Sequence, residues 1–124
     1  MMPYEKLKAW RACMDLYVEV YRATEHWPKR EWYGLAAQVR GATLSAGSNL
    51  AEGVAKRGQR ELARYVNIAL GSLSEVSHQL RAAHAIGILT REEFDRLSAA
   101  HQKAGRLTWL LYAGIKRRLQ DGQT

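Results

Sequence analysis

One stretch of the chain, residues 32–55, constrains the fold more than any other. It reads WYGLAAQVRGATLSAGSNLAEGVA, and Arg40 and Glu52 are its only charged residues. Steps of three and four give an apolar stripe of small and medium residues: Trp32, Leu35, Val39, Ala42, Ala46, Asn49 and Gly53. The opposite face holds Ala37, Gly41, Leu44, Gly47 and Ala51. Because neither face is charged, we expect a helix covered twice, once by its own fold and once by something else.

Three more segments show helical spacing, so the sequence predicts helices over about 5–27, 31–56, 59–86 and 91–120. The inward stripe predicted for the first is Leu7, Trp10, Met14, Tyr17, Tyr21 and Thr24. In the third it is Leu62, Val66, Ala69, Leu73, Val76, Leu80 and Ala83. In the fourth it includes Phe94, Leu97, Ala104, Leu107, Leu111 and Ile115.

Turn signals separate the four predicted helices. Pro28 stops the first helix, and Gly58 with Glu61 can cap the start of the third. Gly87 ends the third helix, and Thr90 with Glu93 forms a capping box for the fourth. Short connections favour antiparallel neighbours. The prediction is an all-α protein, an up-down-up-down antiparallel four-helix bundle that forms one domain over 1–124.

The composition limits the setting of the protein. Cys13 is the only cysteine and neighbours the first stripe, so we expect a packed thiol in a reducing compartment. We find neither an early apolar run typical of a signal peptide nor the ~20 uninterrupted apolar residues of a membrane span. We therefore expect a cytoplasmic protein with no membrane partner.

The net charge of +7 is expected to lie mostly at one end of the bundle. In the predicted topology this end carries eleven Lys and Arg against five Asp and Glu, and the other end carries eight against seven. The eleven cations are Lys6, Lys8, Arg11, Lys56, Arg57, Arg60, Arg64, Arg106, Lys116, Arg117 and Arg118. Tyr65 and Tyr112 lie near them as candidate stacking surfaces. This polarity favours phosphate binding, and the alternative is a solvated surface without a ligand.

Catalytic and metal chemistry have little support. Glu75 and His78 form one Glu-x-x-His pair, but two such pairs build a di-iron site, and Val76 turns this one outward. His101 is expected to be a hydrogen-bonded core histidine. The serines lack a nucleophile turn. We expect a protein that is not an enzyme and holds no cofactor or metal.

Asn49 falls on the inward stripe of the second helix, where an unpaired amide costs about 1 to 3 kcal/mol. It must therefore find hydrogen-bond partners. Glu52, one turn along, is a candidate to join it, with Arg40 or a neighbouring subunit as a third member. We assign these three residues to architecture and not to catalysis.

Segments along nearly the whole chain resemble one family. They are Leu7 and Trp10, Trp27-Pro28, Glu31, Gly34-Leu35, Gln38 to Arg40, SAGSNLAEG at 45–53 and IALGSLSE at 68–75. This combination resembles the bacterial 23S rRNA intervening-sequence proteins. Those proteins are similar in turn to the accessory variability determinant of diversity-generating retroelements. Gly47 and Gly58 depart from the family pattern, in which proline and a capping serine are frequent.

The resemblance implies a four-helix bundle that assembles as a ring-like homopentamer with a positively charged surface. For the retroelement relatives it implies binding to nucleic acid and association with a reverse transcriptase. For the intervening-sequence proteins themselves it implies no defined activity.

Three functional hypotheses follow. The first is a non-enzymatic, oligomeric accessory protein that binds RNA or DNA phosphates through Lys56, Arg57, Arg60 and Arg64, helped by Lys116, Arg117 and Arg118, with Lys6, Lys8 and Arg11 at the same end. In it, the outer residues Ala37, Gly41, Leu44 and Ala51 meet a neighbouring subunit. The second is a structural adaptor that binds another protein and no nucleic acid. The third, a metal enzyme, requires bound iron or manganese.

Overall fold

The computed structural model describes residues 1–122 and is all-helical, as predicted. Its helices are α1 (Lys8–Thr24), α2 (Leu35–Ala55), α3 (Gln59–Ala85) and α4 (Arg91–Gln120), with short 3-10 turns η1 (Pro3–Lys6) and η2 (Lys29–Glu31). The span predicted for the domain also includes Gln123 and Thr124, which lie outside the described residues.

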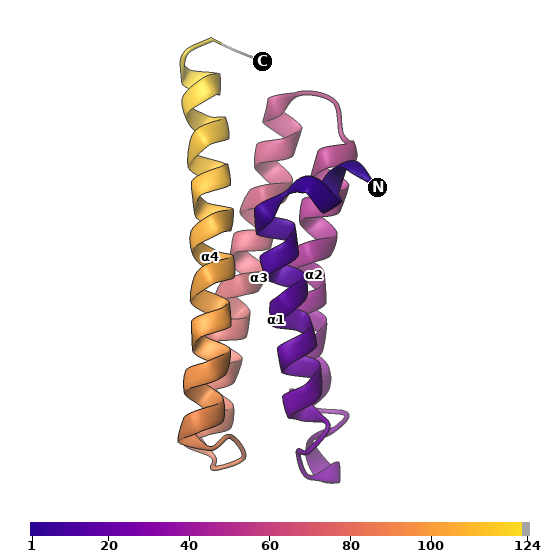
Figure 1. Cartoon of the computed structure of the whole chain (residues 1–124), viewed down its shortest axis with the longest axis vertical. Coiled ribbons are helices and arrows are strands. Elements are labelled where there is room, and N and C mark those ends of the chain that lie inside the picture. The colour runs from indigo at the N-terminus through magenta and orange to yellow at the C-terminus, as the bar shows by residue number, and fades with distance from the viewer. Residues whose placement is uncertain (123–124) are drawn as a thin grey trace.

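The helices run alternately up and down and pack as a four-sided bundle (Figure 1). Each helix contacts the next, and α1 closes the bundle against α4. One end holds the N-terminus, the end of α4 and the α2–α3 connection, and we call it the basic end. The opposite end, here the far end, holds the α1–α2 and α3–α4 connections. The predicted antiparallel four-helix bundle is therefore confirmed.

The inward face of α1 differs from the prediction. Small and medium side chains fill it: Ala9, Ala12, Cys13, Leu16, Val20 and Ala23. Of the predicted stripe, Thr24 is buried and Tyr21 is 42% exposed. Leu7, Trp10, Met14 and Tyr17 are half-buried. The buried face of α1 is therefore rotated around the helix axis from the predicted stripe. Small residues on this face let the helices approach closely, while the aromatic rings of α1 lie at its edges. The helix also begins later, since Leu7 is extended after η1.

The α1–α2 connection is longer than predicted. The first helix ends at Thr24, Pro28 is extended, and α2 begins only at Leu35 after η2 and Gly34. Trp27 fills the base of the core at 4% exposure. Trp32, predicted to face the core from the second helix, is instead 41% exposed and donates Nε1 to the carbonyl of Trp27 at 2.9 Å. Trp27 rather than Trp32 therefore anchors this connection.

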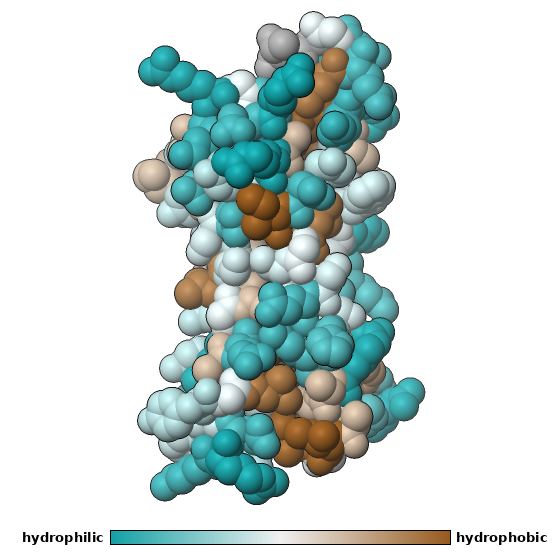
Figure 2. All heavy atoms as spheres, turned by 180° about the vertical axis from the view of Figure 1, so that it is seen from behind, coloured by the Kyte–Doolittle hydropathy of each residue, from teal (hydrophilic) through white to brown (hydrophobic). Residues whose placement is uncertain are grey.

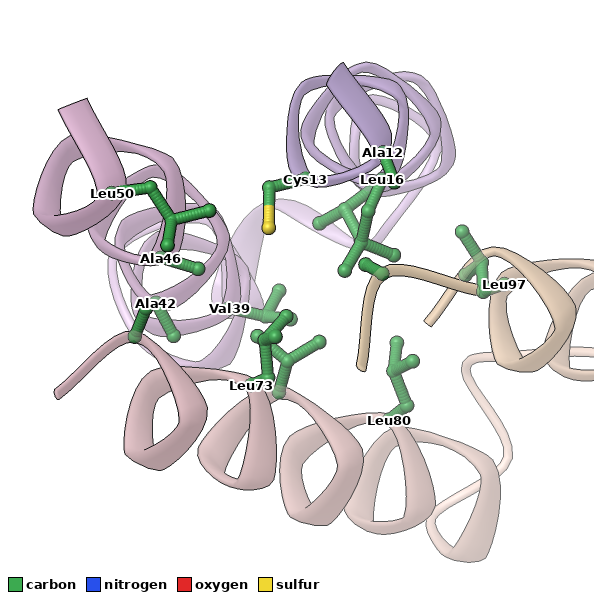
Figure 3. Close-up of a cluster of buried hydrophobic side chains, with 14 of the residues drawn as sticks. Ala12, Cys13, Leu16, Val39, Ala42, Ala46, Leu50, Leu73, Leu80 and Leu97 are labelled. Atoms are coloured by element: carbon green, nitrogen blue, oxygen red, sulfur yellow. The ribbon is translucent and has the colours of Figure 1, made fainter. Parts of the chain in front are cut away.

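The α2 helix lines the core with small side chains. Figure 3 shows Ala42, Ala46 and Leu50 of α2 in a cluster with residues of the other three helices. Gly47 is buried, and a Cβ there would lie 3.7 Å from Trp10 Nε1, so its predicted place on the outer face was wrong. The α2 and α3 helices lie close together at Gly53, where an added Cβ would lie 2.8 Å from Tyr65 Cβ.

The predicted stripe of α3 is confirmed, because every member from Val66 to Ala83 is at most 2% exposed and Leu62 packs at its edge. Gly87 ends α3 with a φ of 85°. Thr90 and Glu93 form the predicted capping box of α4. Gly58 is the N-cap of α3 with a φ of 87°, but Glu61 bonds Arg64 and not the cap backbone, so that part was wrong.

The sequence predicted no membrane-spanning segment, and the length and hydropathy of the helices test this prediction. Within residues 1–122, no helix combines the length and the apolar content that crossing a membrane requires.

Candidate nucleic-acid interface

The basic end gathers cationic side chains from four segments that are distant in the sequence. They come from η1 and α1, the α2–α3 connection, the first turns of α3 and the last turns of α4. The ten cations predicted as nucleic-acid contacts, Lys6, Lys8, Arg11, Lys56, Arg57, Arg60, Arg64, Lys116, Arg117 and Arg118, are all exposed. Figure 2 shows this end uppermost from behind, with hydrophilic side chains around recessed apolar surface.

Little acidic charge neutralises these cations. Among residues 1–122, Arg64 is the only one of the ten in an ion pair, with Nε 3.0 Å from Glu61 Oε2. That hydrogen bond raises the pKa of Arg64 and lowers the pKa of Glu61. Arg118 donates to the neutral Gln59 Oε1 at 3.2 Å. The positive field at this end therefore faces solvent largely uncompensated.

A groove of about 550 Å³ runs between α3 and α4 at the basic end. The α3 wall contributes Arg60, Glu61, Arg64 and Asn67, and the α4 wall contributes Tyr112 and Lys116. Ala63 and Leu119 add apolar surface. This groove combines three cations, one carboxylate that pairs with Arg64, an amide and an aromatic ring, and it brings four of the predicted interface and stacking residues together.

A second groove, of about 400 Å³, lies on the other side of α4 against α1. Lys6, Lys8 and Arg118 border it, and its apolar lining includes Leu110. Six of the ten predicted cations thus line a groove, three on each side of α4. The other four, Arg11, Lys56, Arg57 and Arg117, line neither groove.

The two predicted stacking tyrosines differ in their surroundings. The ring of Tyr65 is occupied by cations, with Arg64 Cζ 4.6 Å and Lys56 Nζ 5.5 Å from its centroid. Tyr112 instead pairs with Trp109, whose ring centroid lies 5.8 Å away. Trp109 is 55% exposed. Only Tyr112 of the two lines the α3–α4 groove.

Sequence reasoning missed Trp109 and Asn67. Both lie beside predicted interface residues at helical spacing, Trp109 three positions before Tyr112 and Asn67 three after Arg64. That spacing places side chains on one helix face and was the available signal. The sequence could not show that the two faces meet across one groove.

Arg40, Asn49 and Glu52 do not form the polar group considered from the sequence. Arg40 donates Nε to Thr24 Oγ1 at 2.6 Å and stacks 3.9 Å from the Tyr21 ring. Asn49 is half-buried, and its Nδ2 donates to the carbonyl oxygen of Ser45 at 2.9 Å, a bond within its own helix. Glu52 is exposed. The version of the predicted network that lies within one chain was therefore wrong, although Arg40 and Asn49 both make structural contacts. The version that includes a neighbouring subunit stays a prediction.

The candidate metal ligands do not converge. Glu75 accepts a hydrogen bond from Gln79 Nε2 at 3.1 Å, and both Glu75 and His78 are exposed. His101 is half-buried with Nε2 2.7 Å from the carbonyl oxygen of Leu73, as expected for a structural histidine. Across the described chain, no cluster of three or more His, Cys, Asp or Glu has an arrangement that could hold a metal.

Comparisons with known proteins give a family and a fold. The sequence model of the 23S rRNA-intervening sequence protein family matches residues 5–109. A comparison with curated proteins gives no match. A crystal structure of a protein of unknown function from the S23 ribosomal protein family of Bacteroides thetaiotaomicron VPI-5482 superposes with a TM-score of 0.75 at 16% identity. The superposition covers 84% of this chain and 97% of the other, and at that identity it shows the fold alone.

Proposed function

The chain belongs to the 23S rRNA-intervening sequence protein family, and from that premise we propose that it is a non-enzymatic, oligomeric RNA-binding accessory protein whose basic end contacts phosphates. The family name connects its members with ribosomal RNA, which favours RNA over DNA as the polyanion. One observation carries the proposal. Cations of four separate segments converge on one end, and within residues 1–122 a single carboxylate, that of Glu61, pairs with one of them.

The chemistry of the basic end suits backbone contacts. Its cations are exposed Lys and Arg side chains, which follow phosphates without reading base edges. Binding of this kind releases counterions, so affinity falls steeply with salt.

The outer face of α2 is the proposed contact between subunits. Ala37 and Gly41 are exposed, Leu44 is 46% exposed and Ala51 is half-buried. Exposed apolar surface of this kind is typical of interfaces. The α2 helix ends at Ala55, and its C-cap Lys56 lies at the basic end. A ring would therefore repeat the basic end once per subunit, and a pentamer is the size that the family resemblance suggests. A monomeric mass in solution would overturn this part.

The proposal is tested by RNA binding across a salt series. The variant Arg57→Gln, Arg60→Gln, Arg64→Gln removes three charges at the basic end. Its matched control, Arg22→Gln, Arg30→Gln, Arg91→Gln, removes three at the far end. We expect the first variant to lose affinity and to reduce the slope of log K against log salt by up to about 2 for single strands. The control should bind like wild type. No affinity at low salt, or equal losses in both variants, would sink the proposal.

A finer part of the proposal is association with a reverse transcriptase, which follows from the resemblance to retroelement accessory proteins. Co-purification with a reverse transcriptase encoded beside this chain tests it.

The alternative function is an adaptor that binds protein only. The exposed Trp109 and Leu110, each 55% exposed, favour it. A stable assembly without measurable affinity for RNA or DNA would select that alternative.

A further inference from the structure

Two aromatic rings of α4 lie next to each other at the α3–α4 groove: Tyr112 lines the groove, and Trp109 lies outside its lining against Tyr112. The Trp109 and Tyr112 rings are tilted by 37° with centroids 5.8 Å apart. Trp109 is more than half exposed, whereas Tyr65 of the same end already carries Arg64 and Lys56 on its ring. Within residues 1–122, no cation lies over Trp109 or Tyr112. This pair therefore keeps aromatic surface that a flat ligand could cover.

The adjoining groove supplies the other contacts of a nucleotide. Arg60 and Lys116 enter it from opposite walls, and Asn67 adds an amide that both donates and accepts. Its volume of about 550 Å³ falls within the range of roughly 300–1,000 Å³ typical of small-ligand sites. Cations beside an aromatic surface are the combination used by proteins that bind single-stranded nucleic acid.

The rings of Trp109 and Tyr112 favour an unpaired strand over a duplex. In a duplex the base faces are stacked on their neighbours, so an aromatic side chain reaches a base face only where the strand is unpaired. The α1–α4 groove provides an internal contrast. It has cations and apolar Leu110 but no aromatic ring in its lining. Phosphate contact is therefore available on both sides of α4, and base stacking on one.

We propose that the α3–α4 groove is a subsite for an unpaired nucleotide of RNA, with Trp109 and Tyr112 as the stacking surface and Arg60, Arg64 and Lys116 as phosphate contacts. The inference rests on the proposed RNA-binding function and narrows it to loops, bulges and single strands. In this subsite, the Asn67 amide forms hydrogen bonds with the edge of the stacked base.

The test compares a 12-nucleotide uridine RNA with an RNA duplex of the same length. The variants are Trp109→Leu and Tyr112→Leu, with Trp109→Phe as the conservative change. Leu110→Ala is the matched control, since Leu110 is as exposed as Trp109 but borders the other groove. We expect each ring loss to weaken single-strand binding about 5- to 100-fold, because stacking on one base carries that much affinity. Trp109→Phe should retain most of it.

Several readouts separate stacking from other roles of these residues. Duplex affinity and the salt slope should stay unchanged in the ring variants, because the rings carry no charge. An abasic 12-nucleotide strand should bind wild type as weakly as the uridine strand binds Trp109→Leu, which tests stacking without altering the protein. Equal losses in Leu110→Ala, or a changed mass in solution for Trp109→Leu, would overturn the subsite. Unaltered single-strand affinity in both ring variants would overturn it while leaving phosphate binding intact. Absence of all RNA affinity in wild type would overturn the proposed function itself.

Discussion

The two ends of the bundle use their charges differently. At the far end, Arg91 pairs with Asp95 and Arg96 with Glu19, each at 3.3 Å. The same end has the Thr90 capping box, whose side chain accepts from the Glu93 backbone at 3.1 Å. At the basic end, a glycine caps α3, and Arg64 with Glu61 is the one ion pair of the described residues there.

This difference indicates that the far end contributes more to folding stability and that the basic end is available for binding. Local interactions that close a helix end are concentrated at the far end, together with the buried Trp27. The basic end keeps its cations in solvent, where each contributes little to stability. Such charges remain free to exchange counterions for phosphates. We therefore expect substitutions at the two ends to separate folding from binding.

The largest effect should come from the tryptophans near the two ends of α1. Trp27 at the far end is 4% exposed, whereas Trp10 near the basic end is half-buried against Tyr4, with ring centroids 4.9 Å apart. Trp27→Ala should lower the free energy of unfolding by about 3–5 kcal/mol, because it empties a buried site. Trp10→Ala should cost less. Urea denaturation followed by circular dichroism measures both, and equal losses would contradict the comparison.

The core beneath the basic end can be tested by pH. Burial raises the pKa of the Cys13 thiol from 9.0 to about 11, against a smaller lowering by its hydrogen bond with Thr108. The folded state thus holds this proton more tightly than the unfolded state. The resulting stability is complete below pH 9 and is lost as pH rises through about 11, a change of about 3 kcal/mol. The unfolding free energy of Cys13→Ala should fall less over this interval, and parallel profiles would refute the assignment.

Glycines of α2 distinguish its inward and outward faces. Gly53→Ala places a Cβ 2.8 Å from Tyr65 Cβ, so α2 and α3 must separate near the basic end. We expect a loss of about 1–3 kcal/mol in thermal or urea unfolding. Gly41→Ala is the matched control, because an added Cβ meets nothing within 4 Å. It should stabilise an isolated chain by up to about 1 kcal/mol. A smaller assembly in Gly41→Ala would locate the subunit contact at this residue.

Single charge removals should give the smallest effects on folding. Arg96→Gln at the far end breaks the ion pair with Glu19 and should cost about 0.2–1 kcal/mol. Lys116→Gln at the basic end should change stability by less than about 0.5 kcal/mol, since Lys116 makes no ion pair among the described residues. A cost for Lys116→Gln as large as that for Arg96→Gln would weaken the separation of folding from binding.

Regular patterns and local chemistry made much of the fold predictable. The α3 stripe was correct because its residues are uniformly apolar and sharply periodic. The breaks at Pro28 and Gly87 and the box of Thr90 with Glu93 depend on neighbours along the chain. The stripe of α1 failed because large rings and small residues compete for the same face. Packing of α1 in the bundle buries Ala12, Cys13 and Leu16 in place of the large rings.

The candidate site also has features that the sequence predicts and features that depend on tertiary structure. By itself the sequence determined four helices and, through their antiparallel order, which cations share an end, because alternation of direction needs only helix number and short turns. Tertiary structure alone decided that α4 separates six of those cations into two grooves, with Arg60 and Tyr112 together in one of them. It also decided that Lys56 and Arg64 lie over the Tyr65 ring, whereas the Tyr112 ring pairs with Trp109. The contacts across each groove join residues far apart in the chain, and the direction of each side chain depends on how its helix is rotated in the bundle, which periodicity leaves open.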